Sequence, residues 1–261
     1  MTSTHRLTRA TDARTLYLAS THPLRVTSTG EALVVACTDG PVQRLPIRLL
    51  HRVVSGPSTD WSGAALALCM QHGVTISWTG PGGEPAGHLW PQQPRPLELA
   101  TLLHALAGND HHWPEAYANW LRCQRLQVLH LWRRQRAQAG QPVGVAEWQA
   151  AKQHLVYRNQ VPEQLPQLLR GMAAALVVAR LADGGLRAHY WACTGQPIAL
   201  ADDITCLVWA EMNLCAGPLA AAIDNPRVAA TLFERWAGTC AGAVYQHLAS
   251  LRAQALRQRN E

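Results

Sequence analysis

The sequence has little charge and no long apolar segment. Charged residues make up 15% of the 261 residues and hydrophobic residues 48%, a balance typical of a globular chain with a sizeable core. It has no uncharged apolar run of about 18 residues, the length that a membrane-spanning helix needs. The first 14 residues are polar and lack the apolar centre of a secretory signal. We therefore expect a cytoplasmic protein with no membrane partner.

The cysteines form no C-x-x-C pair. There are seven of them, scattered along the chain, and the odd number argues against a disulfide framework. This usage is typical of a reducing compartment. We expect mostly buried thiols.

Lysine is almost missing. Of 23 basic residues only Lys152 is a lysine, and the net charge of +6 predicts an anionic partner. The planar fork of arginine binds phosphate oxygens in pairs and stacks on bases. A GC-rich genome produces the same bias, so the positions of the arginines say more than their number.

The first third of the sequence has a strand-like pattern. β-Branched and aliphatic residues alternate between Gly, Pro, Ser and Thr turns, and one helix over residues 62–72 interrupts them. Asp60 or Ser62 can cap this helix, and Gly73 can end it. The clearest predicted strands span residues 33–36, 42–47, 53–54 and 74–78.

The stretch P-Q-Q-P-R-P that follows cannot hold regular structure and is the best linker in the chain. Beyond it, apolar residues recur at helical spacing, with predicted helices over residues 115–138, 163–183 and 201–212 and one or two more over residues 226–259. The sequence therefore predicts an α+β protein with a small β-rich domain (1–90), a linker (91–97) and a larger all-α domain (98–261).

The helix predicted over residues 115–138 is rich in arginine. Its basic residues can form either a solvated face or a surface that contacts the DNA phosphate backbone. Trp132 lies among them and can pack in the core or stack on a base. The candidate DNA-binding residues are Arg122, Arg125, Arg133, Arg134 and Arg136.

The segment C-T-G-Q-P-I-A-L-A-D-D-I-T-C has the spacing of a metal site. Asp203 and Cys206 are three residues apart on a predicted helix and should share a face, with Cys193 on the preceding loop. Mg²⁺ and Mn²⁺ prefer oxygen ligands, whereas two of these three positions are thiols.

Three interpretations of this segment stay open. Both thiols can be ordinary buried cysteines. A Mg²⁺ or Mn²⁺ site can survive on Asp203, Asp202 and a distant glutamate. Zn²⁺ can bind Cys193, Cys206 and either Asp203 or His189.

The same segment resembles the CRISPR-associated protein 1 family, the integrases of CRISPR adaptation. Members carry a pattern close to H-T-G-K-P-L-x-x-x-x-D-I-A-D. Without a gap, the family histidine falls on Cys193, the first aspartate on Asp203 and the second acid on Cys206.

A second resemblance lies near the amino terminus. There the family has short strands, an "iP-x-x-x-I-x-x-I-v-v-x-G" segment and a short helix ending "x-x-G-I-x-v". In this sequence Pro46, Gly56, Ala65, Leu66 and Gly73 fall at the fixed points of that pattern. The two matches cover most of the chain and leave residues 97–160 weakly matched.

The resemblance implies a metal-dependent DNA integrase or endonuclease. Family members use Mg²⁺ or Mn²⁺, held by Glu, His and Asp, to join double-stranded DNA to the CRISPR repeat. The family glutamate matches Glu147 in G-V-A-E-W-Q-A-A-K, and His189 could replace the missing imidazole. The implied partners are double-stranded DNA, CRISPR-associated protein 2 and a second subunit bound through the β-rich domain.

The sequence departs from the family where the chemistry lies. Cys193 and Cys206 replace hard ligands by weakly ionised thiols, which leaves Asp203 as a single charge. We expect a DNA-binding relative with weakened or lost catalysis, working as a homodimer or beside an active paralogue, with Mg²⁺ or Mn²⁺ as cofactor if it is active and no metal cofactor otherwise. An active enzyme with rearranged ligands and a non-enzymatic interaction subunit are the alternatives.

Overall fold

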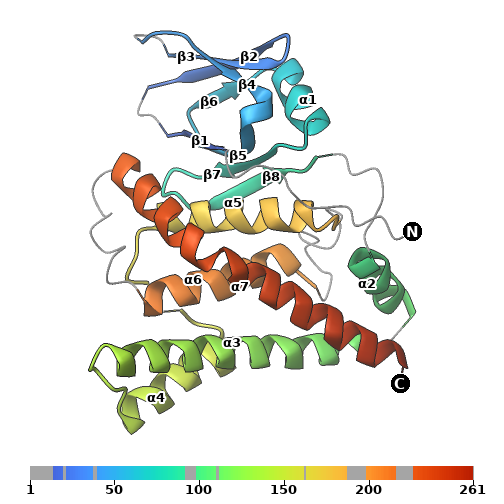
Figure 1. Cartoon of the computed structure of the whole chain (residues 1–261), viewed down its shortest axis with the longest axis vertical. Coiled ribbons are helices and arrows are strands. Elements are labelled where there is room, and N and C mark those ends of the chain that lie inside the picture. Colours follow the sequence, from blue (N-terminus) through green and yellow to red (C-terminus); the bar gives the residue numbers. More distant parts are fainter. Residues whose placement is uncertain are drawn as a thin grey trace, which may run out of the picture.

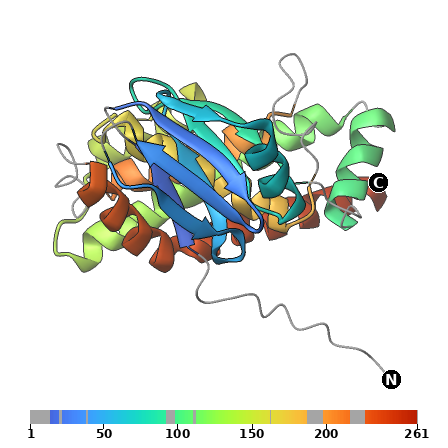
Figure 2. The same ribbon diagram turned by 90° about the horizontal axis from the view of Figure 1, so that it is seen from above.

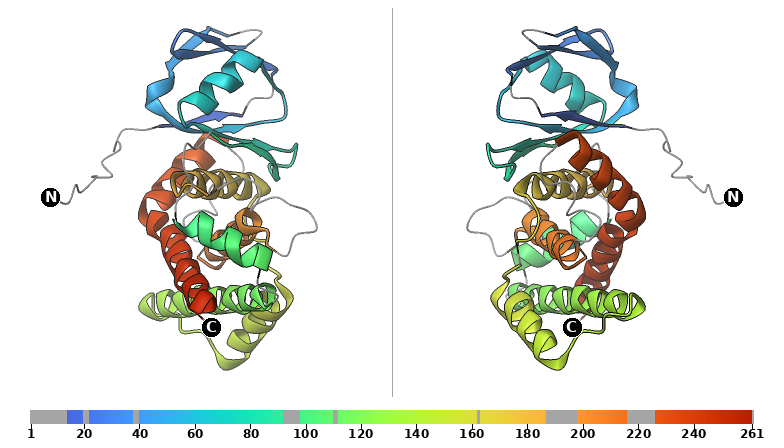
Figure 3. Two further views of the ribbon diagram at one scale, coloured as in Figure 1. Left: turned by 90° about the vertical axis from the view of Figure 1, so that its right-hand side faces the viewer. Right: turned by 90° about the vertical axis from the view of Figure 1, so that its left-hand side faces the viewer.

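The computed structural model describes residues 14–19, 22–37, 40–91, 98–109, 112–161, 163–186, 198–215 and 226–260. Strands come first and helices follow, so the α+β prediction is confirmed. Figures 1 and 3 show the strand-rich part at one end of the molecule, with the helices beneath it. Most of the predicted linker lies outside the described residues.

The strand-rich part consists of two four-stranded sheets. The first has the order β1-β5-β7-β8 and the second β4-β3-β2-β6. β1 is parallel to β5 and β5 to β7, so the first sheet joins segments that are distant in sequence. Figure 2 shows the sheets from above. The strands are β1 (Arg14–Leu18), β2 (Leu24–Thr29), β3 (Ala32–Cys37), β4 (Gln43–Pro46), β5 (Leu50–Ser55), β6 (Thr59–Trp61), β7 (Thr75–Thr79) and β8 (Pro85–Leu89).

Both sheets share a core with α1 (Gly63–Gln71). Val26, Leu33, Val53 and Ile76 are fully buried there because alternate side chains of each strand point to the same face. The Ser62 side chain accepts a hydrogen bond from the Ala65 amide and caps α1, as predicted.

The remaining elements are helical. α3 begins two residues before the predicted start, since Pro114 suits a first helical turn. α5 begins four residues after the predicted start, because Pro166 stands at its N-cap. The helices are α2 (Glu98–Asn109), α3 (Trp113–Gln138), α4 (Val145–Lys152), a π-helical turn (Gln153–Tyr157), α5 (Gln167–Asp183), α6 (Leu200–Leu214) and α7 (Pro226–Asn260).

α5 is the central helix and lies directly beneath the first sheet (Figures 1 and 3). All residues from 171 to 179 are buried, since the sheet covers one side of α5 while α6 and α7 cover the other. A helix enclosed in this way is apolar all round. The strand-rich and helical parts therefore share a packed interface.

Glycines bring the β7–β8 turn against the start of α5. A Cβ atom on Gly171 would lie 2.4 Å from the carbonyl oxygen of Gly83 and 2.5 Å from Thr79 Cγ2. A Cβ atom on Gly83, whose φ is +90°, would lie 2.4 Å from the backbone of Leu168. Only glycine permits this approach of backbone to backbone.

Polar contacts of β1 and β5 also join the two parts. The buried Arg52 guanidinium lies 2.6 Å from Glu234 Oε1 of α7, and the Tyr17 hydroxyl donates to the same carboxylate. Burial raises the pKa of Tyr17, so its hydroxyl keeps the proton that it donates.

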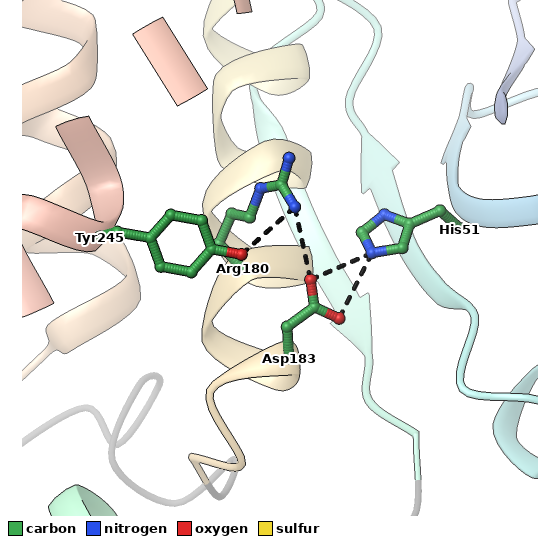
Figure 4. Close-up of polar contacts among 4 residues, drawn as sticks. All are labelled: His51, Arg180, Asp183 and Tyr245. Atoms are coloured by element: carbon green, nitrogen blue, oxygen red, sulfur yellow. Dashed lines mark hydrogen bonds and ion pairs between the residues drawn. The ribbon is translucent and has the colours of Figure 1, made fainter. Parts of the chain in front are cut away.

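A second cluster links β5, α5 and α7 (Figure 4). His51 Nε2 lies 3.1 and 3.3 Å from the two carboxylate oxygens of Asp183. Arg180 contacts the same carboxylate at 3.5 Å and donates to the Tyr245 hydroxyl at 3.4 Å. The orientation of the sheet over the helices is thus fixed by polar contacts as well as by packing.

A buried polar network lies between α3 and α7. Gln124 Nε2 donates to Ser250 Oγ at 3.0 Å, and Gln124 Oε1 lies 2.8 Å from His247 Nδ1. Burial lowers the pKa of His247 to about 4. The imidazole is therefore neutral in the folded protein at pH 7.

This histidine predicts a loss of stability in mild acid. The unfolded state binds a proton near pH 6.5 and the folded state only near pH 4, so the free energy of unfolding falls as the pH drops between these values. We expect His247 to contribute a loss of about 2 kcal/mol between pH 7 and pH 5. The measurement is urea unfolding of the wild type and of His247→Gln across this range.

The variant should lose less stability than the wild type. Exposed His72 provides the control, since His72→Gln should keep the wild-type pH dependence. Equal pH dependence in wild type and His247→Gln would show that His247 does not carry the effect.

Candidate functional site

The first turns of α6 place Asp203 beside α3. The buried Tyr117 hydroxyl donates to Asp203 Oδ2 at 2.9 Å, and its pKa is raised well above 10, mainly by burial. Burial also raises the pKa of Asp203, against the effects of Tyr117 and Arg125. Part of this carboxylate's acceptor capacity is therefore used by a phenol.

Two arginines border the same face of α6. Arg125 of α3 interacts electrostatically with Asp203 and Cys206. Arg170 of α5 lies close enough to Cys206 and Asp202 to interact electrostatically with both. Asp203 and Cys206 thus lie on one face, as their spacing predicts, and two guanidinium groups supply positive charge beside them.

Cys206 carries a neutral thiol in the metal-free protein. Burial raises its pKa despite the nearby Arg170, so the thiol keeps its proton at neutral pH. A thiol must lose that proton before it binds a metal.

Glu147 does not lie beside Asp203 and Cys206. It stands in the first turn of α4, half exposed, with its carboxylate 3.6 Å from Arg136 near the end of α3. Tyr117, which contacts Asp203, is near the start of α3, and about 28 Å of helix separate it from Arg136. The Tyr117–Asp203 and Arg136–Glu147 contacts are too short to span that length. The structure therefore does not bring Glu147 and Asp203 to one ion.

The described residues of this site do not fit Mg²⁺ or Mn²⁺. They offer the Asp203 carboxylate, which is already bonded to a phenol, the Asp202 carboxylate beside Arg170, a neutral thiol and two arginine cations, where these ions need several free oxygens. Across the described ranges, no three His, Cys, Asp or Glu side chains lie together in a way that could hold a metal ion. Cys193 and His189 lie outside the described residues, so the zinc interpretation stays a prediction.

The five candidate DNA-binding arginines differ in their position around the α3 axis and in their exposure. Arg122, Arg125, Arg133 and Arg136 fall within about 80° around the helix axis, and Arg134 lies outside that arc. Arg125 and Arg136 are partly buried at the two carboxylates described above. Arg122, Arg133 and Arg134 are exposed and can contact a ligand.

Several contacts at this site were not predicted from the sequence. Tyr117 belongs to an aromatic row with Trp113 and Trp120, at ring distances of 6.0 and 5.3 Å. Arg133 lies 5.4 Å from the ring centre of Trp148, on the other side of a sharp turn in the chain. Helical spacing could have grouped the aromatics, but the part played by Arg170 depends on how α5 packs.

The sequence model of the family described as "CRISPR associated protein Cas1" matches residues 16–204 of this chain, well over half of it. The chain belongs to the Cas1 family. The match spans both the strand-rich part and Asp203. No curated protein matches the sequence.

Solved structures of Cas1 proteins share this fold. A Cas1 protein from Thermotoga maritima has a TM-score of 0.67 at 11% identity, covering 93% of this chain and 97% of the other. The TtCas1–DNA complex has a TM-score of 0.59 at 17% sequence identity, and the match covers 92% of this chain and 91% of the other. A chain of a Cas6-RT-Cas1–Cas2 complex has a TM-score of 0.58 at 14% sequence identity, and the match covers 95% of this chain and 35% of that longer one.

None of the helices within the described ranges is long and apolar enough to cross a membrane.

Proposed function

We propose that this Cas1 family member is a DNA-binding component of CRISPR adaptation whose catalysis is weakened or lost. Membership of the family supports the role in adaptation. The observation that carries the loss of catalysis is the surrounding of Asp203 and Cys206 by Tyr117, Arg125 and Arg170.

The DNA duplex lies along α3 in this proposal. Figures 1 and 3 show α3 and α4 at the end of the molecule farthest from the sheets. Exposed Arg122, Arg133 and Arg134 supply cations for phosphate oxygens, and Arg133 is held beside the Trp148 ring. The TtCas1–DNA complex, which shares this fold, supports DNA as the partner.

Charge substitution explains how such a site keeps its shape without a divalent ion. A Cas1 metal site gathers negative charge that the ion neutralises. Here Arg125 and Arg170 neutralise the remaining carboxylates from within the chain. No step of phosphodiester chemistry is assigned to these residues.

The protein partners follow from the family. We propose that a second subunit, either a copy of this chain or an active paralogue, binds through the strand-rich part. CRISPR-associated protein 2 is the other proposed partner, and the complex of a Cas1-containing chain with Cas2 supports it. An active paralogue would provide the catalysis that this chain lacks.

Two assays on the same preparation test the proposal. Fluorescence anisotropy with a labelled duplex should show DNA binding. The logarithm of the association constant should fall linearly with the logarithm of the salt concentration between about 50 and 200 mM. A joining assay with a branched DNA substrate and Mn²⁺ should give no product. Asp203→Ala should leave both results unchanged, because Asp203 is assigned no catalytic role.

Either of two results would contradict the proposal. Joined product that disappears in Asp203→Ala would show an active enzyme with a rearranged ligand set. Absence of salt-dependent DNA binding would favour an interaction subunit that never contacts DNA.

A further inference from the structure

A cavity of about 460 Å³ lies along β1, between the two sheets and the start of α7. None of the residues that line it belongs to α3 or to the Asp203 site. Arg227 and Ala230 form its wall on the α7 side, and Figure 1 shows the first turns of α7 next to the strand-rich part. Its apolar floor consists of Leu16, Leu18, Leu24 and Val35.

β1 has a strand on only one side within the described part of the chain. The Gly56 amide donates to the Leu18 carbonyl oxygen at 2.9 Å, so the main-chain polar groups of Leu18 face β5. Because these groups point to opposite edges in successive residues of a strand, those of Thr15 and Tyr17 face the open edge. The irregular register at the start of this pair passes over His51 of β5, so the alternation along β1 holds.

This edge is open to pairing with another strand. Among the described residues, none hydrogen-bonds to the main chain of Thr15 or Tyr17 there. Exposed strand edges are usually protected by charged side chains or proline, and residues 15–18 have the sequence T-L-Y-L, with neither. β1 therefore offers main-chain donors and acceptors beside an apolar floor.

The two faces of β1 determine which side chains an added strand would need. Leu16 and Leu18 point to the apolar floor, so every second side chain of the added strand would lie over it. Tyr17 points to the other face, where its hydroxyl contacts Glu234 of α7. Arg227 lies about two helical turns before Glu234 and is exposed. The alternate side chains of the added strand would therefore lie on the side of α7.

The charge on that side favours an acidic segment. Of the described residues that line the cavity, Arg227 alone is charged. The Glu234 carboxylate is neutralised by the Arg52 guanidinium at 2.6 Å. A guanidinium group binds a carboxylate through two parallel N–H groups, and the start of a helix adds partial positive charge.

We propose that the open edge of β1 binds an extended segment of another protein, which joins the first, four-stranded sheet as a fifth strand. The segment carries apolar side chains at alternate positions and acidic side chains between them. Main-chain hydrogen bonds to Thr15 and Tyr17 provide affinity, while the apolar floor and Arg227 provide specificity. This protein-binding surface is separate from α3 and does not depend on DNA binding.

The first test uses two synthetic peptides, acetyl-V-E-V-E-V-E-V-amide and the same peptide with lysine in place of glutamate. Calorimetric titration of the full chain should show the glutamate peptide binding about tenfold more tightly. Arg227→Glu should reverse this preference. Arg48→Glu is the matched control, because Arg48 is exposed in the strand-rich part but does not line the cavity, and it should leave the preference unchanged.

The second test detects the main-chain pairing itself. Hydrogen exchange of the Thr15 and Tyr17 amides should slow when the glutamate peptide binds, whereas the Leu16 and Leu18 amides, which face β5, should be unaffected. Two further peptides carry N-methyl groups on alternate amide nitrogens, one on the odd positions and one on the even positions. Only the peptide whose methyl groups face β1 should lose binding, because only those nitrogens donate to the open edge.

Four results would overturn the proposal. They are no binding of the glutamate peptide, equal binding of the glutamate and lysine peptides, and equal binding of the two N-methylated peptides. The fourth is slow exchange of the Thr15 and Tyr17 amides before any peptide is added, which would mean that this chain or a second copy already covers the edge.

Discussion

Replacing Arg122, Arg133 and Arg134 together by glutamine should lower the affinity for duplex DNA about a hundredfold near 150 mM salt. Each of these exposed arginines is expected to neutralise one phosphate and release its counterion. The slope of log affinity against log salt should therefore become shallower by about 2.7. Anisotropy titrations of a labelled duplex at several salt concentrations measure both quantities.

A matched variant separates contact from net charge. Arg25, Arg44 and Arg48 are also exposed, and they lie in the strand-rich part at the opposite end of the molecule from α3. Replacing these three by glutamine removes the same charge and should change the affinity less than threefold, about the effect of long-range steering alone. Equal losses in the two triple variants would refute α3 as the DNA surface.

Gly171→Ala should lower the free energy of unfolding by about 2 kcal/mol. The added Cβ atom meets the Gly83 carbonyl oxygen at 2.4 Å, and this atom belongs to a tight turn that cannot rotate away. The gain in helix propensity, at most ~1 kcal/mol, offsets only part of the clash. Chemical denaturation followed by circular dichroism measures the change.

Gly238 of α7 provides the control for this substitution. A Cβ atom there would have no heavy atom within 4 Å, so Gly238→Ala should raise the free energy of unfolding by up to ~1 kcal/mol. The two substitutions are identical in chemistry and opposite in expected sign. Stabilisation by Gly171→Ala would mean that the sheet does not pack on α5 as closely as the structure shows.

Local patterns predicted most of the elements. The alternation of Leu33 with its neighbours marks β3, and the spacing of leucines and tryptophans marks α3. The predicted start of α5 was wrong because the apolar pattern begins before Pro166, whereas this proline sets the boundary of the helix. Parallel pairing of β1 with β5 joins residues far apart in sequence, which no local pattern specifies.

The site was only partly predictable. The spacing of Asp203 and Cys206 follows from helix geometry, and their shared face needed no tertiary information. The contacts that define their chemistry come from Tyr117, Arg125 and Arg170 on two other helices. Their approach depends on packing of the whole helical core, so the sequence showed which ligands were changed but not which cations replaced the ion.

Calorimetric titration of the protein with Mn²⁺ tests the central claim most directly. Because guanidinium groups and a protonated thiol surround Asp203, we predict no saturable binding that differs between the wild type and Asp203→Ala. A one-site binding heat that is present in the wild type and lost in Asp203→Ala would contradict the claim and show that a divalent ion still binds there.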